Sequence, residues 1–288
     1  MADALTVSAA LAAAQIRLAA LGADANREAR LLLRAATQLD GGALEAGPER
    51  PLDAAQARRY EDFVARRARG EPFAYIVGRR EFWSLELLVS PAVLVPRPET
   101  ELLVERLLQW SGTDDLLDLG TGCGAIALAA ASERPAWHIT ATDLSAAALE
   151  VAMLNAGRLG LHRVEFLQGS WFDAVPGRRF GAIVSNPPYV GELEPEMQGT
   201  ALLHEPRLAL TPGRDALAAL RSIIADSPDF LRSGGHLALE HGATQAGAVR
   251  ELLVARGFRH VRSYPDLAGL LRVTEGQWAP ASPQESSP

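Results

Sequence analysis

The feature that most constrains the fold is a regular alternation of apolar strands and helical segments that begins at residue 114. The pattern predicts strands at 115–119, 138–142, 164–168, 180–185 and 236–241, and helices at 124–133, 145–160, 214–232 and 243–256. Alternation at this spacing predicts a parallel sheet with helices on both faces. Two more strands, near 258–264 and 270–274, are expected to complete this α/β domain.

Residues 1–72 instead predict a small all-helical domain. Its helices are expected at 5–21, 25–39 and 53–69. Gly41-Gly42 is expected to close the second helix, and Asp53 is the expected N-cap of the third. Five arginines on that third helix are interpreted as a solvated face, the alternative being contact with an acidic or RNA-containing partner: Arg58, Arg59, Arg66, Arg67 and Arg69.

A β-hairpin is expected to link the two domains. Aromatic, apolar and polar residues alternate over 73–97 and are interrupted by Gly78-Arg79-Arg80. The larger domain then runs from 98 to 276, beginning with a helix at 98–111. The segment 277–288 is expected to be disordered, because its stretch "APASPQESSP" has no core-forming side chains.

Composition limits both the environment and the partners. The lone Cys123 cannot form an internal disulfide or a metal cluster, so no metal is expected and a reducing compartment is favoured. The Ala-rich N-terminus lacks the features of a signal peptide, and no stretch reaches the roughly 18–20 apolar residues that span a bilayer. We therefore expect a cytoplasmic protein with no membrane contact.

The charge distribution argues against a nucleic-acid substrate. Residues 73–288 hold 18 Arg and 25 Asp plus Glu, a net charge of −7, and all 28 basic residues of the chain are arginine. A domain that grips duplex phosphates is usually basic. An acidic catalytic portion favours another kind of substrate.

A glycine-rich turn follows the first predicted strand, in "LLDLGTGCGAIALAAA" at residues 116–131. Gly120, Gly122 and Gly124 allow positive φ and let a ligand lie against the backbone near free N–H groups of a helix. Asp143 ends the next strand and is placed to accept hydrogen bonds from ribose hydroxyls. Asp118 suits a cationic amino group. The set favours S-adenosylmethionine, with a dinucleotide or a purely structural turn as alternatives.

A second turn follows the fourth strand, in "IVSNPPYVG" at residues 183–191. Its strand should end at the same sheet edge as the glycine turn, where open α/β sheets bind ligands. A planar amide is a poor nucleophile and must be held with its N–H groups satisfied. The Asn186 oxygen and the Pro187 carbonyl can accept those N–H groups, and the Tyr189 ring can stack on the amide. The alternative is a stiff structural turn.

The motifs "DLGTGCGAIAL", "ATDLS", "WFDAV", "IVSNPPYV" and "GGHLALEHG", after an upstream "FWSLELLVSPAVLVPRPETE", resemble the HemK/PrmC family of release factor N5-glutamine methyltransferases. The resemblance covers about residues 5–275. It implies a Rossmann-like class I methyltransferase with a seven-stranded, mostly parallel sheet, joined by a β-hairpin to a helical domain that recognises the substrate protein. It also implies methylation of the glutamine in the Gly-Gly-Gln motif of class I peptide chain release factors, with S-adenosylmethionine as donor and S-adenosylhomocysteine as product.

The resemblance also implies site residues. The cofactor-binding set is Gly120, Thr121, Gly122, Cys123, Gly124, Asp143, Trp171 and Asn186. The substrate-binding set is Asn186, Pro187, Pro188 and Tyr189, of which Asn186, Pro187 and Tyr189 are expected to be catalytic. The family often has an acid before the tryptophan, where this chain has Ser170, and a polar pair where it has Leu270-Leu271.

Related enzymes use the same or a similar catalytic tetrapeptide on two other substrates. One is a glutamine of a large-subunit ribosomal protein, and "PRPETE" at residues 96–101 favours release factors over it. The other is adenine N6 in nucleic acid, which the acidic charge disfavours. A non-catalytic adaptor would lack Asn186, Asp143 or a loop glycine. We expect a monomer that binds release factors transiently, and a structural role for His241.

Overall fold

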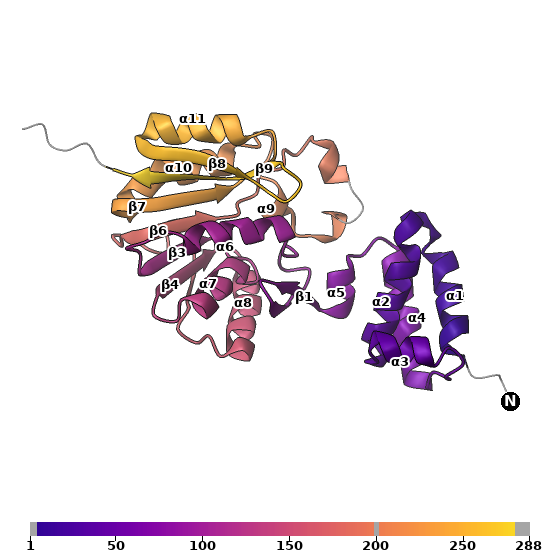
Figure 1. Cartoon of the computed structure of the whole chain (residues 1–288). Coiled ribbons are helices and arrows are strands. Elements are labelled where there is room, and N and C mark those ends of the chain that lie inside the picture. The colour runs from indigo at the N-terminus through magenta and orange to yellow at the C-terminus, as the bar shows by residue number, and fades with distance from the viewer. Residues whose placement is uncertain (1–4, 199–201, 280–288) are drawn as a thin grey trace, which may run out of the picture. The chain divides into compact units, whose positions relative to one another are not determined.

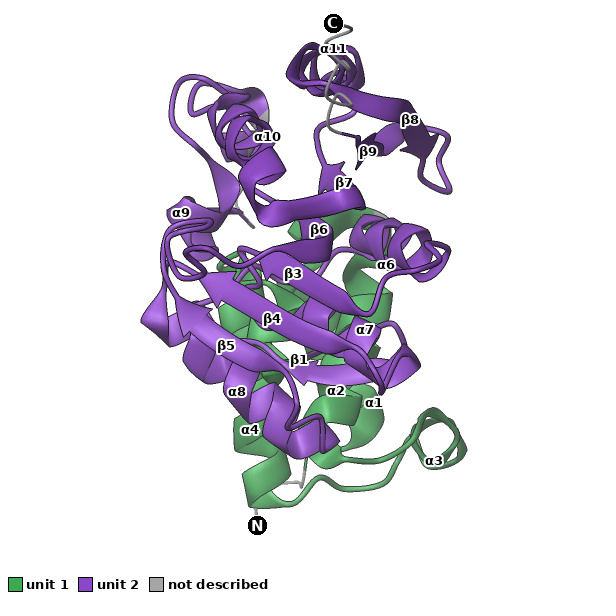
Figure 2. Cartoon of the chain, turned by 90° about the vertical axis from the view of Figure 1, so that its left-hand side faces the viewer, with its two compact units in different colours: residues 1–79 green, residues 80–288 purple. Residues whose placement is uncertain are grey.

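The chain divides into two units, residues 1–79 and 80–288, which Figure 2 colours separately. A computed structural model describes residues 5–198 and 202–279, and Figure 1 labels the elements in chain order. Of the segment expected to be disordered, residues 280–288 lie outside the described residues. The prediction is wrong for Gln277 and Trp278, which belong to the last strand of the sheet. Among the described residues, no helix combines the length and the apolar character needed to cross a bilayer.

The first unit is all-helical, as predicted. It contains α1 (Val7–Arg17), η1 (Ala19–Asp24), α2 (Ala25–Thr37), α3 (Gly41–Ala46), α4 (Ala54–Ala68) and α5 (Phe73–Val77). Its core joins the apolar faces of α1, α2 and α4, with Leu32, Leu33 and Val64 almost fully buried. The Asp53 carboxylate caps α4 by accepting from the backbone N–H groups of Ala55 and Gln56, both at 2.8 Å. The Gln56 side chain completes this capping box.

The prediction that Gly41-Gly42 closes the second helix is wrong. Helix α2 ends at Thr37, followed by Gln38 in the left-handed conformation with φ 60°. Asp40 then caps α3 by accepting from a backbone N–H at 2.7 Å, and both glycines lie inside this short helix. An aspartate just before the glycines supplies a helix start that outweighs the low helix propensity of glycine.

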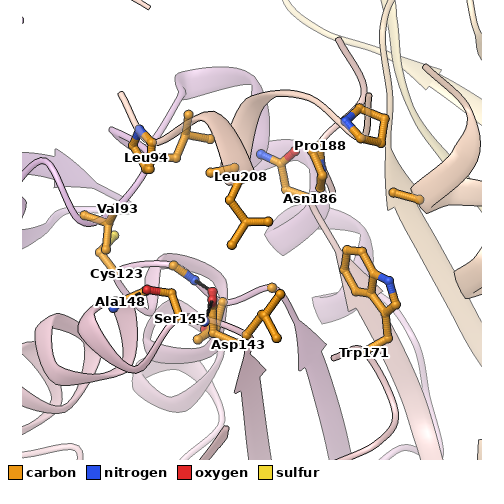
Figure 3. A pocket seen from close by; sticks show the side chains of 18 of the residues that line it. Val93, Leu94, Cys123, Asp143, Ser145, Ala148, Trp171, Asn186, Pro188 and Leu208 are labelled. Carbon is orange, nitrogen blue, oxygen red and sulfur yellow. Dashed lines mark hydrogen bonds between the residues drawn. The ribbon is translucent and has the colours of Figure 1, made fainter. Parts of the chain in front are cut away.

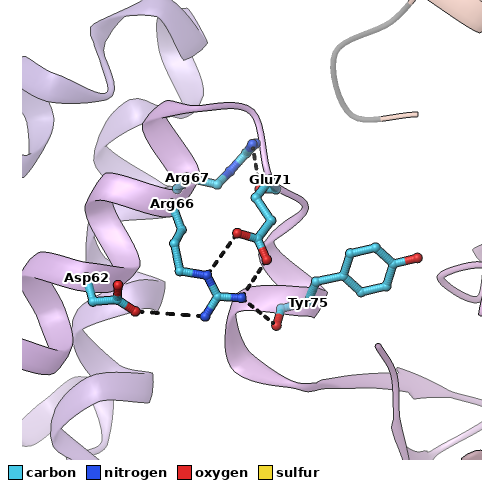
Figure 4. A network of polar contacts seen from close by, with 5 residues as sticks. All are labelled: Asp62, Arg66, Arg67, Glu71 and Tyr75. Carbon is cyan, nitrogen blue, oxygen red and sulfur yellow. Dashed lines mark hydrogen bonds and ion pairs between the residues drawn. The ribbon is translucent and has the colours of Figure 1, made fainter. Parts of the chain in front are cut away.

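Part of the arginine cluster on α4 is committed to ion pairs within the first unit (Figure 4). Arg66 donates to both carboxylate oxygens of Glu71 and to the Tyr75 carbonyl. Arg67 donates to Glu28 at 3.0 Å, which ties α4 to α2. The interpretation as a solvated face therefore fails for Arg66 and Arg67, because both hold the packing of α4 against its neighbours.

The linker contains a shorter hairpin than predicted. Residues 73–77 form helix α5, which Gly78 ends with φ 75°. The strands are β1 (Arg79–Phe82) and β2 (Leu85–Leu88), so the turn is at Trp83 and Ser84, with φ 52° and 57°, and not at Gly78-Arg79-Arg80. Trp83 is held there because its backbone N–H donates to Glu101 and its indole N–H to Glu133, both at 2.8 Å.

The second unit is built on the predicted seven-stranded sheet. Its strands are β3 (Asp115–Leu119), β4 (His138–Asp143), β5 (Glu165–Gln168), β6 (Phe180–Ser185), β7 (Leu231–Glu240), β8 (Phe258–Pro265) and β9 (Leu271–Trp278). They are ordered β5-β4-β3-β6-β7-β9-β8. All neighbours are parallel except β9, which runs antiparallel to β7 and β8.

Helices cover both faces of this sheet (Figure 2). On one face lie α10 (Ala218–Phe230) and α11 (Ala246–Arg256), whose apolar side chains cluster with Leu117, Leu119 and Ile183. On the other lie α6 (Glu101–Leu108), α7 (Ala125–Glu133) and α8 (Ala146–Leu159). Short helices complete the connections: η2 (Pro98–Thr100), η3 (Pro195–Gln198), η4 (Leu202–His204) and α9 (Arg207–Leu210).

The capping box of α4 predicts a local stability effect. Asp53→Ala should destabilise this helix by about 1 kcal/mol, because two backbone N–H groups lose their acceptor. Hydrogen exchange of peptides from residues 54–68, read by mass spectrometry, should accelerate. The matched control is Asp24→Ala, since Asp24 precedes α2 without making a cap hydrogen bond. Equal acceleration of α2 exchange in the control would show that the cap bonds are not the cause.

Candidate active site

The site begins where β3 and β6 pair at the carboxyl edge of the sheet. In their register Leu119 lies beside Ser185, and the Ser185 hydroxyl donates to the Leu119 carbonyl at 2.7 Å. Strands β4 and β5 continue on one side of β3, whereas β7 continues on the far side of β6. This reversal of strand order opens a crevice at the strand ends. Gly120 and Asn186, the next residues of the two strands, therefore lie at the same crevice.

The turn between β3 and α7 needs glycine at two positions for different reasons. Gly120 has φ 70°, and a Cβ there would lie 3.6 Å from the Trp171 ring, in the space between the turn and the indole. Gly124 has φ 88°, and its Cβ would lie only 2.9 Å from Leu128 Cδ1. A side chain at Gly124 would thus be strained and would push the turn away from α7.

The end of β4 fixes this turn in place. Backbone N–H groups of Gly120 and Thr121 donate to the Thr142 carbonyl at 2.9 and 3.0 Å. Asp143 accepts from the Gly122 N–H at 2.9 Å through one oxygen and from the Ser145 N–H at 2.8 Å through the other. Burial raises the pKa of Asp143, and these backbone N–H groups oppose the rise. Each carboxylate oxygen keeps further lone pairs for a ligand.

A cavity of about 510 Å³ opens between the two turns (Figure 3). Its wall combines the glycine turn, the end of β4, Trp171 and Asn186 with parts of two segments, 92–96 and 206–212. In Figure 3 the Leu208 side chain extends into the cavity between Asn186 and Asp143. The volume is in the range of sites for small molecules and cofactors.

Most of the predicted site residues line this cavity. Those that do are Gly120, Thr121, Gly122, Cys123, Asp143, Trp171, Asn186 and Pro188, and Ser170 joins them. Gly124, Pro187 and Tyr189 are not part of its wall. The Pro187 ring is buried, and no described residue donates to its carbonyl. The half-buried Tyr189 ring packs against the apolar cluster of the sheet, and its stacking on a substrate amide stays a prediction.

Two buried titratable groups lie at the glycine turn. Asp118 is fully buried and accepts from the Thr121 hydroxyl at 2.6 Å, while its Oδ1 has no partner in the described part of the chain. Burial raises its pKa to about 7. Asp118 does not line the cavity. It holds Thr121, and its contact with a ligand amino group stays a prediction. Burial also raises the pKa of Cys123 to about 12, which keeps it a neutral thiol.

A polar network backs the Asn-Pro-Pro-Tyr turn. Asn186 Nδ2 donates to the Thr100 hydroxyl at 3.0 Å, and the Tyr189 hydroxyl donates to Glu240 Oε1 at 3.0 Å. Glu240 is 1% exposed, and burial raises its pKa to about 7. The hydroxyls of Thr100 and Tyr189 favour the charged carboxylate and oppose this rise. The Tyr189 carbonyl accepts from Gln245 at 2.9 Å. The sequence analysis singled out His241 and not its neighbour Glu240. His241 is buried and its ring is hydrogen-bonded to Thr274, which is consistent with the expected structural role.

Segment 206–212 is anchored by Glu205, a residue that sequence reasoning missed. Its side chain is 1% exposed and accepts from the Val95 N–H at 3.1 Å and from the Arg97 guanidinium. The pair ties one wall segment of the cavity to the other across 108 positions of sequence. No local pattern marks such a contact.

Asn155 of α8 is a second missed residue. It is fully buried, and its oxygen accepts from the Leu88 N–H at 2.6 Å. Its Nδ2 donates to the carbonyls of Leu88 and Cys123, at 3.0 and 2.9 Å. One side chain therefore joins the end of the hairpin to the glycine turn.

Comparison with known proteins decides the family. Models described as the PrmC N-terminal domain and the Methyltransferase small domain match residues 9–78 and 98–217. A release factor glutamine methyltransferase of Pseudomonas aeruginosa is 48% identical over 258 residues, which cover 89% of this chain and 94% of that protein. One of Coxiella burnetii is 46% identical over 249 residues, covering 85% and 89%. The chain belongs to the HemK/PrmC family.

The structural comparison agrees with this family at the level of the fold. A crystal structure of a methyltransferase from Pyrococcus furiosus superimposes with a TM-score of 0.53 at 20% identity, covering 68% of this chain and 89% of that one. The likeness confirms the Rossmann-like class I methyltransferase fold predicted from the sequence. The seven-stranded, mostly parallel sheet confirms it independently.

The Asn155 bridge predicts a change in cofactor binding. Asn155→Ala should weaken binding of S-adenosylmethionine about tenfold, because each buried backbone group left unpaired costs roughly 1–3 kcal/mol and loosens the glycine turn. Isothermal titration calorimetry measures the affinity. Asn26→Ala, at an exposed helical asparagine of the first unit, should bind like the wild type. Unchanged affinity in Asn155→Ala would refute the bridge.

The raised pKa of Asp118 predicts a pH effect on stability. Between its usual pKa of about 4 and its folded pKa of about 7, the folded chain holds a proton that the unfolded chain has lost. This group therefore makes stability fall as pH rises through that window. Asp118→Asn should show a smaller loss of unfolding free energy between pH 5 and pH 8, measured by urea denaturation. A variant with the wild-type pH dependence would contradict this assignment.

Proposed function

We propose that this chain transfers a methyl group from S-adenosylmethionine to the side-chain amide nitrogen of the glutamine in the Gly-Gly-Gln motif of class I peptide chain release factors. One observation carries the proposal. Asn186 has its Nδ2 occupied by Thr100, which leaves its oxygen as an acceptor at the cavity formed by the glycine turn. The curated relatives named as release factor glutamine methyltransferases support the choice of substrate.

The wall of the cavity fits S-adenosylmethionine. Trp171 and Asp143 both line the cavity, and we infer that the adenine contacts the Trp171 ring beside Gly120 and that the ribose hydroxyls donate to Asp143. Cys123 and Ala148 add an apolar surface. When bound, this cofactor supplies an electrophilic methyl group, and S-adenosylhomocysteine is the product.

The chain's own residues orient the amide. The Asn186 oxygen accepts one N–H of the substrate amide and the Pro187 carbonyl accepts the other, so the nitrogen lone pair faces the cofactor site. With the cofactor bound, its methyl group would pass to this nitrogen, the carbon–sulfur bond would break with its electron pair left on sulfur, and one N–H proton would pass to water. Alignment of this kind is worth roughly 7–11 kcal/mol of barrier in favourable geometries, so no strong general base is required.

Tyr189 takes a different part in this proposal from stacking on the amide. Its hydroxyl is held by Glu240 and its carbonyl by Gln245, while its ring packs on the sheet. These contacts anchor the end of the tetrapeptide and keep Asn186 and Pro187 in place. Pro188, which does line the cavity, is the better candidate for contact with the substrate.

The partner and location follow from this substrate. We propose that the chain acts in the cytoplasm as a monomer and that it binds a release factor transiently. The helical residues 1–72 are proposed to recognise the substrate protein, 73–97 to act as a linker, and 98–276 to carry the chemistry. The exposed Leu193, Leu203 and Leu208, on the connection between β6 and α10, offer apolar contacts for that protein.

The assay that tests this function uses labelled S-adenosylmethionine with three substrates: a class I release factor, the large-subunit ribosomal protein that carries a methylatable glutamine, and DNA. Label should appear on the release factor and vanish when the glutamine of its Gly-Gly-Gln motif is replaced by glutamate. Label on DNA or the ribosomal protein, with none on the release factor, would overturn the proposal.

The role of Asn186 predicts a separation of chemistry from cofactor binding. Asn186→Ala should lower the rate of methyl transfer about 100-fold or more, because the amide loses its alignment. Affinity for S-adenosylmethionine, measured by calorimetry, should stay within about threefold of wild type, a difference below 1 kcal/mol. Loss of cofactor binding in this variant would show that Asn186 serves the cofactor instead. Asn26→Ala again provides the matched control.

A further inference from the structure

The direction of the Asn186 carboxamide decides whether the proposed chemistry can occur. A carboxamide has one accepting and one donating end, and only the accepting end can bind an N–H of the substrate amide. If the group were turned by 180°, two donors would face each other and the substrate would be repelled. Something in the protein must therefore fix the orientation before the substrate arrives.

Thr100 is the residue that contacts the other end of Asn186. It is 4% exposed, lines the cavity, and its hydroxyl oxygen lies 3.0 Å from Asn186 Nδ2. A hydroxyl can accept and donate, so Thr100 by itself would satisfy either orientation of the carboxamide. The choice depends on where the hydroxyl proton of Thr100 points.

Glu240 lies behind Thr100 and removes this ambiguity. Its carboxylate is 1% exposed, and Oε1 already accepts from the Tyr189 hydroxyl at 3.0 Å. Its Oε2 is buried without a hydrogen-bond partner in residues 5–198 and 202–279. The nearby Thr100 hydroxyl favours the charged form of Glu240 and so opposes the rise of its pKa, although the two groups do not meet hydrogen-bond geometry. Above a pH of about 7 the Glu240 carboxyl is mostly ionised, and an ionised carboxylate only accepts, so it draws the Thr100 proton towards itself. The Thr100 oxygen is then left to accept from Asn186.

We propose that Glu240 and Thr100 are positioning residues that set the direction of the Asn186 carboxamide, so that its oxygen faces the glutamine amide. The inference rests on the proposed function. In this arrangement each contact has one direction, from the substrate N–H to Asn186, from Asn186 to Thr100, and from the Thr100 hydroxyl towards the Glu240 carboxylate. A buried carboxylate that leaves one oxygen unpaired is costly to keep, and its use as the fixed acceptor at the end of this series accounts for it.

The kinetic test compares two changes at one position. Thr100→Val keeps the shape but removes the hydroxyl, and should lower kcat for release factor methylation about 10- to 100-fold. KM for the release factor and the affinity for S-adenosylmethionine should change by no more than about threefold. Thr100→Ser restores the hydroxyl and should recover most of kcat. Thr37→Val, at a buried threonine of the first unit, should leave kcat unchanged.

Glu240→Gln separates positioning from a merely structural role. The change removes a buried charge, so the melting temperature should hold or rise, while kcat should fall because glutamine can present a donor to Thr100. Wild-type kcat in Thr100→Val or in Glu240→Gln would overturn the proposal. Equal loss in Thr100→Ser and Thr100→Val would also overturn it, since shape and not the hydroxyl would then be the cause.

A measurement without substrate distinguishes this proposal from the proposed function. In protein labelled with ¹⁵N at asparagine side chains, the Asn186 signal is assigned by its loss in Asn186→Ala. The proton that is hydrogen-bonded to Thr100 should exchange slowly with water in the wild type and in Thr100→Ser, and faster in Thr100→Val. Slow exchange in a protein that methylates no release factor would leave the network standing and the function refuted. Fast exchange in the wild type would refute the network.

Discussion

The pairing of β3 with β6 is the constraint on which the site depends. Its register sets Leu119 beside Ser185, so both strands end at the same level of the sheet edge. A slip of one residue would turn the side chains of one strand to the opposite face and break the hydrogen bond from Ser185 to the Leu119 carbonyl. The glycine turn and the Asn-Pro-Pro-Tyr turn meet because the backbones of the two strands do.

Polar side chains then join the segments that surround the edge of the sheet. Asn155 joins the hairpin to the glycine turn, Glu205 joins the two outer wall segments, and Asp143 holds the turn from the end of β4. Each of these groups is expensive to bury unless all its hydrogen bonds are made. Such contacts have a direction as well as a strength, and therefore fix geometry more tightly than apolar packing of similar energy.

The sequence predicted what depends on local pattern. Strands β3 and β6 match the predicted ranges 115–119 and 180–185. A short apolar run that is followed by glycine or proline is compatible with few structures other than a buried strand. The turn at Trp83-Ser84 was missed, because neither residue type favours positive φ and the bonds that hold Trp83 there go to Glu101 and Glu133, 18 and 50 positions along the chain. Thr100, Asn155 and Glu205 were missed for the same reason: each acts through a partner that no periodicity marks. Tyr189 was recognised, but Glu240, the acceptor of its hydroxyl, was not.

The location of the cavity wall has a consequence for how proteins of this kind can diversify. All the residues that form the described wall fall between positions 92 and 222, within the second unit. The composition of the wall is thus encoded in one continuous stretch of the gene, separate from the part that encodes the first 79 residues. Recombination that exchanged that first part would leave the identity of every residue in the described wall unchanged.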